Sequence, residues 1–418
     1  MSCACTASVH DLFASLGIDV DAAMKAAAAV PVSIHCWQGD DVGGFEHETA
    51  AGVDGGLAVT GNYPGKARTP GELRADLEEV LRLVPGVSRV NLHACYAEFD
   101  SAPRVDRDAI TVEHFRNWMD WAKAQGVHLD FNPTFFAHPK AADGLPLTNR
   151  DPAIRDFWVE HGKRCREISA AMGRELGSSV LDNFWTPDGM KDTPADRLGS
   201  RRRLAESLDR IFAETIDPAL TVESVESKLF GVGCESFTPG SNEFYLGYAA
   251  SRGKFLCLDA GHFHPTEVIS DKLSAVYDFV PGIALHVSRP VRWDSDHVVT
   301  LNDELLAIAQ ELVGNDLFPK TRVGLDYFDA SIHRVAAWAI GARNMRKALL
   351  MAFLTPFGKI REAEAAGDYT TRLALQEAFK TLPFGAVWDE FCERHGAPGG
   401  LGLLREVKAY EAAVTSKR

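Results

Sequence analysis

Residues 283–288 read IALHVS and residues 322–327 read RVGLDY. Each is a short, mainly apolar run, and a stretch with helical periodicity lies between them. Working outward from this pair gives six more runs of the same kind, at residues 31–36, 88–93, 127–132, 180–185, 221–227 and 255–259. Successive runs are far enough apart for a crossover helix, so they can lie parallel in one sheet. Eight such units predict a single (β/α)8 barrel of the TIM type.

Helical patterns fill most of the gaps between these runs. They lie at residues 72–84, 111–125, 151–175, 201–216, 266–279, 303–313 and 332–354. We therefore expect an α/β barrel over residues 1–354 that carries the active site and begins with one short N-terminal helix. Residues 355–418 are expected to form a helical C-terminal extension that serves as an oligomer contact. A doubly wound sheet is the alternative arrangement of the same elements.

Composition and charge narrow the class of protein. The chain has 418 residues, of which 46% are hydrophobic and 24% charged, as in an ordinary globular protein. Its net charge of −14 argues against a nucleic-acid partner, because such proteins need a basic surface. No apolar run approaches the ~18 residues of a membrane span, and the eight cysteines contain no C-x-x-C pair. We expect a cytoplasmic enzyme with no membrane partner.

The residues that close the eight runs are mostly polar or aromatic. They are His35, His93, Asn132, Trp185, Glu226, Asp259, His286 and Asp326. A single histidine there is usually a hydrogen-bonded core residue, and a single aspartate is usually a helix cap. Four consecutive runs ending in Glu, Asp, His and Asp are harder to explain in this way. The carboxyl ends of barrel strands meet at one mouth, where crowded carboxylates need a cation to stay ionised. The last four of these residues therefore predict a metal site.

A second group of possible ligands follows the sixth and seventh runs. His262 lies three residues after Asp259, and Asp294 and Asp296 lie beyond His286. One imidazole and two carboxylates can bind an ion and leave positions open for water or substrate. No cysteine belongs to either group. A set rich in oxygen favours Mn²⁺, Mg²⁺ or Co²⁺, and Zn²⁺ is also compatible.

Lys228 lies two residues after Glu226, so both side chains point to the same side of an extended segment. We interpret Lys228 as a cation that polarises a substrate oxygen, and the alternative is a lysine that only balances charge. Trp185 and Phe131 are expected to form an apolar wall for substrate, or else to pack the barrel.

His93 and Asp326 are the candidates for moving a hydroxyl proton. Each closes one of the eight runs, so each is expected at the mouth of the barrel.

Five sequence blocks resemble the L-rhamnose isomerase family. They are HCWQGDD at 35–41, TGNYPGKAR at 60–68, VESKLFG at 225–231, LDAGHFHPTEV at 258–268 and HVSRPVRWDSDH at 286–297. The likeness runs from about residue 10 to about residue 412, and it includes every proposed metal ligand.

This resemblance implies a barrel like that of xylose isomerase, with two divalent ions per subunit. Members interconvert L-rhamnose and L-rhamnulose in the cytoplasm and are usually homotetramers. Lys228 would touch O1 of the opened sugar. The catalytic ion is typically Mn²⁺, with Zn²⁺, Co²⁺ or Mg²⁺ possible at one site. By position, the first ion takes Glu226, Asp259, His286 and Asp326, and the catalytic ion takes His262, Asp294 and Asp296.

The reaction route stays open at this point. A hydride can shift directly between C1 and C2, which the family favours, or a base can remove a proton through an enediol. Two other functions compete with an isomerase: a metal-dependent hydrolase of the phosphodiesterase type on a related barrel, and a non-catalytic protein that binds sugar or metal. The negative charge counts against polyanionic substrates. The sequence leaves the preferred sugar undecided.

Overall fold

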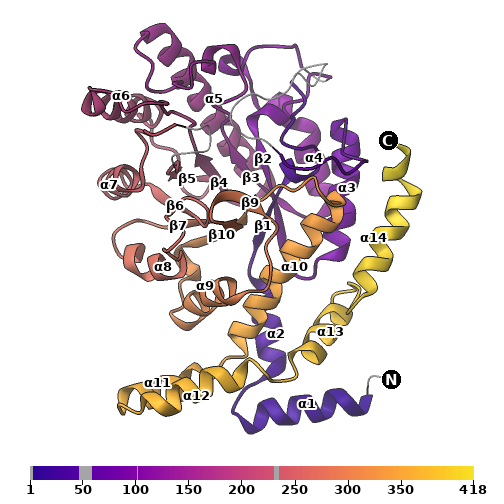
Figure 1. Cartoon of the computed structure of the whole chain (residues 1–418). Helices are drawn as coiled ribbons and strands as arrows, with labels where there is room; N and C mark the ends of the chain where they lie inside the picture. The colour runs from indigo at the N-terminus through magenta and orange to yellow at the C-terminus, as the bar shows by residue number, and fades with distance from the viewer. Residues whose placement is uncertain (1–2, 47–58, 101, 230–234) are drawn as a thin grey trace.

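The computed structural model of the chain describes residues 3–46, 59–100, 102–229 and 235–418. Eight parallel strands form a closed barrel in the order β1-β10-β7-β6-β5-β4-β3-β2 (Figure 1). The strands are β1 (Val32–His35), β2 (Ser88–His93), β3 (His128–Asn132), β4 (Val180–Phe184), β5 (Thr221–Glu226), β6 (Phe255–Asp259), β7 (Ile283–Val287) and β10 (Thr321–Leu325). The predicted barrel is confirmed, and each bound lies within two residues of its expected position. Because β1 pairs with β10, the doubly wound alternative is excluded.

Side chains alternate along each strand between the barrel interior and the helical layer. On β7, Leu285 packs in the large core beneath the helices, while Ala284 and His286 point inward. Ala284 joins Leu181 and Cys257 in a small apolar cluster inside the barrel. Since the polar strand ends come two residues later along the same strands, they lie on an apolar floor.

Helices surround the barrel on its outer side (Figure 1). They are α3 (Pro70–Leu83), α4 (Arg116–Gln125), α5 (Pro152–Leu176), α6 (Arg197–Ile211), α7 (Asn242–Arg252), α8 (Ser270–Tyr277), α9 (Asp303–Gly314) and α10 (Arg334–Phe353). The expected helices are all present. Helix α7 was not expected, because its sequence, NEFYLGYAASR, mixes aromatic, small and polar residues without a clear apolar stripe. None of the helices in the described ranges is long and apolar enough to cross a bilayer.

Two further features differ from expectation. The chain begins with two helices, α1 (Cys3–Ser15) and α2 (Val20–Ala29), where one was predicted. The segment after β7, in which no strand was predicted, forms an antiparallel hairpin of β8 (Arg289–Val291) and β9 (Trp293–His297). Proline and aspartate are depleted in strands, which is why this hairpin gave no strand signal.

The predicted C-terminal helices are α11 (Phe357–Ala365), α12 (Tyr369–Phe379), α13 (Phe384–Arg394) and α14 (Gly402–Ala413). A second apolar core joins α13 and the end of α12 to the N-terminal helices, with Phe13, Met24, Leu350, Trp388 and Phe391 among its buried members. This core lies outside the barrel, and it packs α13 against α1, α2 and the end of α10.

The end of the chain is fastened to the first barrel helix. Figure 1 shows α14 running alongside α3. The guanidinium of Arg418 donates to both carboxylate oxygens of Asp76 on α3, at 2.6 and 2.9 Å, and the hydroxyl of Tyr410 donates to the same carboxylate at 2.7 Å. Asp76 is 1% exposed. Buried and fully paired, this carboxylate holds the tail against the barrel.

Removing the carboxylate of Asp76 should therefore destabilise the folded protein. We expect Asp76→Ala to lower the free energy of unfolding by about 3 kcal/mol, because it removes the bidentate partner of the buried Arg418 and leaves it with the longer 3.8 Å ion pair to Glu72. Urea denaturation followed by circular dichroism measures the change. The control is Asp120→Ala on α4, whose exposed carboxylate lies 3.9 Å from Lys123 and should contribute less than about 0.5 kcal/mol. Equal effects of the two substitutions would contradict this account of the tail.

Candidate metal centre

Four polar side chains meet at the carboxyl ends of β5, β6, β7 and β10. Nδ1 of His286 lies 3.2 Å from Oε1 of Glu226 and 3.3 Å from Oδ2 of Asp326. The same nitrogen is 3.8 Å from Oδ2 of Asp259. One donor atom from each of the four residues lies within 4.8 Å of the others. The structure therefore brings together the set that the strand ends predicted.

A second set lies beside the first. One donor atom each from Asp259, His262 and Asp294 lies within 4.8 Å of the others, and Nε2 of His262 is 3.1 Å from Oδ2 of Asp294. Asp296 lines the same cavity but is not part of this close triplet. Asp294 and Asp296 both come from β9, and Asp296 has a φ of 43°, a strained value for a residue with a side chain. Asp259 thus belongs to both sets.

The pKa values of the ligand residues show how closely their negative charges are packed. Burial raises the pKa of Asp259 well above its ordinary value, and the charge of Glu226 adds to the rise. Burial and the neighbouring Asp294 likewise raise the pKa of Asp296. Burial alone would lower the pKa of His262, but the charges of Asp259 and Asp294 outweigh it and raise that pKa. Protons are therefore retained at this mouth unless another cation takes their place.

The pKa of Asp326 is lowered, unlike those of Asp259 and Asp296. Burial would raise its pKa, but hydrogen bonding to His286 and the positive charge there hold the pKa at about 2. Its second oxygen, Oδ1, accepts a hydrogen bond of 3.0 Å from Nε1 of Trp37. Asp326 is thus kept ionised and fixed in orientation.

The donor set fits divalent cations. Five carboxylates and two imidazoles face one another, so the groups that would bind an ion are mostly hard oxygens. The expectation that no cysteine belongs to the site needs one correction, because the buried thiol of Cys257 lies within 4.8 Å of donor atoms of Glu226 and His286. A divalent ion can replace the protons that Asp259, Asp296 and His262 otherwise keep, since ligand binding and deprotonation are coupled.

These groups open onto one cavity. Its other wall is largely aromatic or apolar. The lining residues are Trp37, Val42, His93, Asn132, Phe136, Asn183, Trp185, Glu226, His262, His286, Asp294, Asp296, Asp326 and Phe328. A polar end beside an aromatic wall suits a ligand that has both hydroxyl groups and apolar carbon faces.

Trp185 lies in this wall, edge-on to Phe136 with the ring centroids 5.9 Å apart. Phe131 does not line the cavity. It is fully buried in the outer core and contacts Phe115, at 5.1 Å between ring centroids. The reason is strand alternation: Asn132, the next residue of β3, takes the inward position, so Phe131 points to the helices.

Lys228 is also placed differently from expectation. Its Nζ donates to the carbonyl of Pro187 at 2.7 Å and forms an ion pair with Glu235. It is not among the described residues that line the cavity. Strand β5 ends at Glu226, so the two-residue alternation assumed for Lys228 no longer applies there. Its contact with substrate stays a prediction.

Some residues of the site were not predicted. Trp37 follows β1 in a short 3-10 turn, and Phe136 lies in the turn after β3, where no periodic pattern marks a side chain as inward-facing. Asn183, which donates to Oε2 of Glu226, had a usable signal. It occupies an inward position on β4, two residues before Trp185, and strand alternation alone would have found it.

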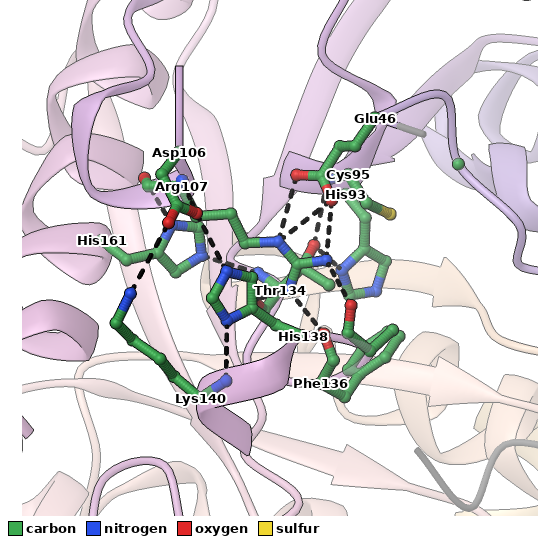
Figure 2. Close-up of polar contacts among 12 residues, drawn as sticks. Glu46, His93, Cys95, Asp106, Arg107, Thr134, Phe136, His138, Lys140 and His161 are labelled. Carbon is green, nitrogen blue, oxygen red and sulfur yellow. Dashed lines mark hydrogen bonds and ion pairs between the residues drawn. The ribbon is translucent and has the colours of Figure 1, made fainter. Parts of the chain in front are cut away.

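His93 lies half-buried in the cavity wall, between the ring edges of Trp37 and Phe136, at centroid distances of 4.8 and 5.6 Å. Its Nδ1 is 3.3 Å from Oγ1 of Thr134. Figure 2 shows His93, Thr134 and Phe136 next to the guanidinium of Arg107. Burial lowers the pKa of His93 to about 4, so its imidazole is neutral at pH 7.

Comparison with known proteins agrees with the family resemblance. The family model for L-rhamnose isomerase (RhaA) matches residues 6–418. The chain is 58% identical over 406 residues to L-rhamnose isomerase of Escherichia fergusonii, covering 97% of this chain and 96% of that protein. Identity to the Citrobacter koseri enzyme of the same name is 57%, with the same coverage.

Solved structures with a similar course of chain include L-ribulose 3-epimerase, at 16% identity and a TM-score of 0.46, covering 74% of this chain and 98% of that one. D-psicose 3-epimerase with D-tagatose from Clostridium cellulolyticum H10 has 12% identity and a TM-score of 0.46, covering 77% and 97%. Family assignment rests on the sequence matches, which span nearly the whole chain. The chain belongs to the L-rhamnose isomerase family.

Proposed function

We propose that this chain is a metal-dependent aldose–ketose isomerase that interconverts L-rhamnose and L-rhamnulose. The observation that carries the proposal is the pair of ligand sets that share Asp259 and open onto one aromatic cavity, in a chain of this family. We assign Mn²⁺ to both sets, with Co²⁺, Mg²⁺ or Zn²⁺ as substitutes at one of them. Glu226, Asp259, His286 and Asp326 would hold one ion, and His262, Asp294 and Asp296 the other.

The reaction moves one hydrogen between C1 and C2 of the open-chain sugar and exchanges the carbonyl and hydroxyl groups. Bound divalent ions would supply Lewis acidity at the two oxygens. The chain must then orient the sugar, exclude water and manage the hydroxyl proton. Trp185, Phe136 and Phe328 give the cavity a wall against which the apolar face and the methyl group of a 6-deoxy sugar can pack.

His93 and Asp326 are our candidates for handling the hydroxyl proton. The imidazole of His93 is neutral and lies in the wall, so it can accept a proton or a hydrogen bond from the sugar. Asp326 is already bonded to Trp37 and lies close to His286. Its pKa of about 2 makes it a better ligand than a base. We therefore favour His93 for the proton and Asp326 for the metal.

The route of hydrogen transfer can be read from isotope incorporation. We propose a direct hydride shift, since every described carboxylate of the cavity belongs to a ligand set. The imidazole of His93, with a pKa of about 4, can exchange a proton with a sugar hydroxyl but is too weak a base to remove a proton from carbon. Turnover of L-rhamnose in D₂O should then leave carbon-bound deuterium in the product near background. Mass spectrometry and proton NMR of L-rhamnulose measure it. Substantial deuterium at C1 would instead establish exchange through an enediol.

The second ligand set can be tested apart from the first. We expect His262→Ala and Asp294→Asn each to lower kcat at least 100-fold and to remove one of two Mn²⁺ binding events in isothermal titration calorimetry. Chelation should abolish turnover of the unmodified enzyme, and added Mn²⁺ should restore it. His264→Ala is the matched control, because His264 is exposed and belongs to neither ligand set; its ring bonds to Thr266 and contacts the ring of Trp293. Two intact binding events in His262→Ala would refute the assignment.

We also propose that the enzyme is a cytoplasmic homotetramer, with the C-terminal extension at residues 355–418 among its subunit contacts. The large apolar side chains of Tyr369, Leu373, Leu401 and Leu404 are 57–85% exposed on this extension. Cys36, Cys95 and Cys257 are free buried thiols, as suits a reducing compartment. Light scattering should give four times the 45.7 kDa subunit mass. A mass of one subunit at micromolar concentration would exclude the tetramer.

A further inference from the structure

We propose that Thr134 and Arg107 are positioning residues that hold His93 and Phe136 in the cavity wall. The inference rests on the proposed function, because it assigns His93 a part in the reaction. Neither residue lines the cavity. Both act through the turn after β3, at residues 134–137, which carries Phe136 to the wall (Figure 2).

Arg107 fixes the backbone of this turn. Its guanidinium donates to the carbonyls of Thr134 and Phe136, at 2.7 and 2.5 Å, and to the carbonyl of Ala137 at 3.3 Å. Ala137 has a φ of 54°, a conformation that needs such support in a residue with a side chain. The fork of the guanidinium thus matches three carbonyls of one turn that a lysine could not reach together.

Glu46 balances the charge of Arg107. Its carboxylate accepts from Nη2 at 2.8 Å and from Nε at 3.1 Å. Arg107 is 3% exposed, so it would be costly to bury without this partner. Glu46 belongs to the segment after β1, Arg107 to the segment after β2, and the carbonyls to the turn after β3. One buried cation therefore joins three neighbouring segments at the mouth of the barrel.

The backbone of Thr134, the residue that contacts His93, is itself held in place by His161. Its backbone N–H donates to Nε2 of His161 at 3.0 Å, and Nδ1 of His161 lies 3.0 Å from the carbonyl of Arg107. Because Nε2 of His161 accepts, its proton resides on Nδ1 and is donated to that carbonyl. Thr134 is completely buried and cannot move without breaking these bonds.

The hydroxyl of Thr134 is held at a set position. Its Oγ1 accepts from the backbone N–H of Cys95 at 3.1 Å and lies 3.3 Å from Nδ1 of His93. The edges of Trp37 and Phe136 confine the same imidazole ring. The ring of His93 also forms a hydrogen bond to the backbone of Pro133, the residue before Thr134. The hydroxyl of Thr134 thus acts with this neighbouring backbone group to set the orientation in which His93 meets a substrate.

A matched pair of substitutions tests this role. Thr134→Val keeps the shape of the side chain and removes the hydroxyl, and we expect kcat for L-rhamnose with Mn²⁺ to fall about 10- to 100-fold while KM changes less than about threefold. Thr134→Ser keeps the hydroxyl and should recover most of the lost kcat. Mn²⁺ binding measured by calorimetry should be the same in all three proteins. A similar kcat in Thr134→Val and the unmodified enzyme would overturn the inference.

Thr321→Val is the control for loss of a buried hydroxyl. Thr321 is 5% exposed and donates to the carbonyl of Leu317 at 2.7 Å, but it begins β10 at the opposite end of the barrel. We expect it to lower thermal stability and leave kcat unchanged. If Thr134→Val and Thr321→Val lower stability and kcat alike, Thr134 has only a structural role.

A second readout does not depend on turnover. In protein labelled with ¹⁵N-histidine, the Nδ1 signal of His93, assigned by its loss in His93→Gln, should shift in Thr134→Val and in Arg107→Lys. Thr134→Ser should leave it near its original position. An unchanged signal in Thr134→Val would overturn the inference even if the enzyme acts on another sugar. Failure of the unmodified enzyme to isomerise L-rhamnose would instead count against the proposed function alone.

Discussion

Repulsion among buried carboxylates is the constraint on which this structure depends. Closing eight parallel strands into a barrel forces Glu226, Asp259 and Asp326 into one small space with His286. Two like charges 4 Å apart repel by about 4 kcal/mol at an effective dielectric constant of 20. Several such pairs would consume much of the stability of an ordinary domain. The centre must therefore bind either protons or metal cations. The repulsion that would destabilise the fully ionised carboxylates thus favours binding of the divalent ions that the proposed reaction needs.

The barrel separates this charge from a second polar layer. At the amino ends of the strands, Arg89 forms a buried ion pair with Asp130, which also accepts from Ser33 at 2.6 Å. Because Arg89 neutralises the carboxylate of Asp130, the pKa of Asp130 is lowered despite burial. Leu181 and Ala284 lie in the apolar cluster between the two layers. One end of the barrel thus neutralises its acids with an arginine, while the other leaves them available as ligands.

Strand alternation explains both what could be predicted from the sequence and what could not. The ends of the apolar runs predicted Glu226, Asp259 and His286 as neighbours because the period of two and the parallel order fix where such residues point. The same rule, applied one residue out of step, placed Phe131 in the cavity, and applied beyond the end of β5, it placed Lys228 there. Trp37 and the β8–β9 hairpin lie where tertiary contacts decide the conformation, so no local pattern marked them.

The attachment of Arg418 to Asp76 has a consequence for biosynthesis. Thr415 contacts His333, and Arg418 contacts Asp76 and the carbonyl of Gly65, so Arg418 pairs with a carboxylate that the ribosome makes 342 positions earlier. At about 5–20 residues per second, roughly tens of seconds separate the synthesis of Asp76 from that of Arg418. During that interval α3 carries an acidic side chain whose cationic partner has not yet been synthesised.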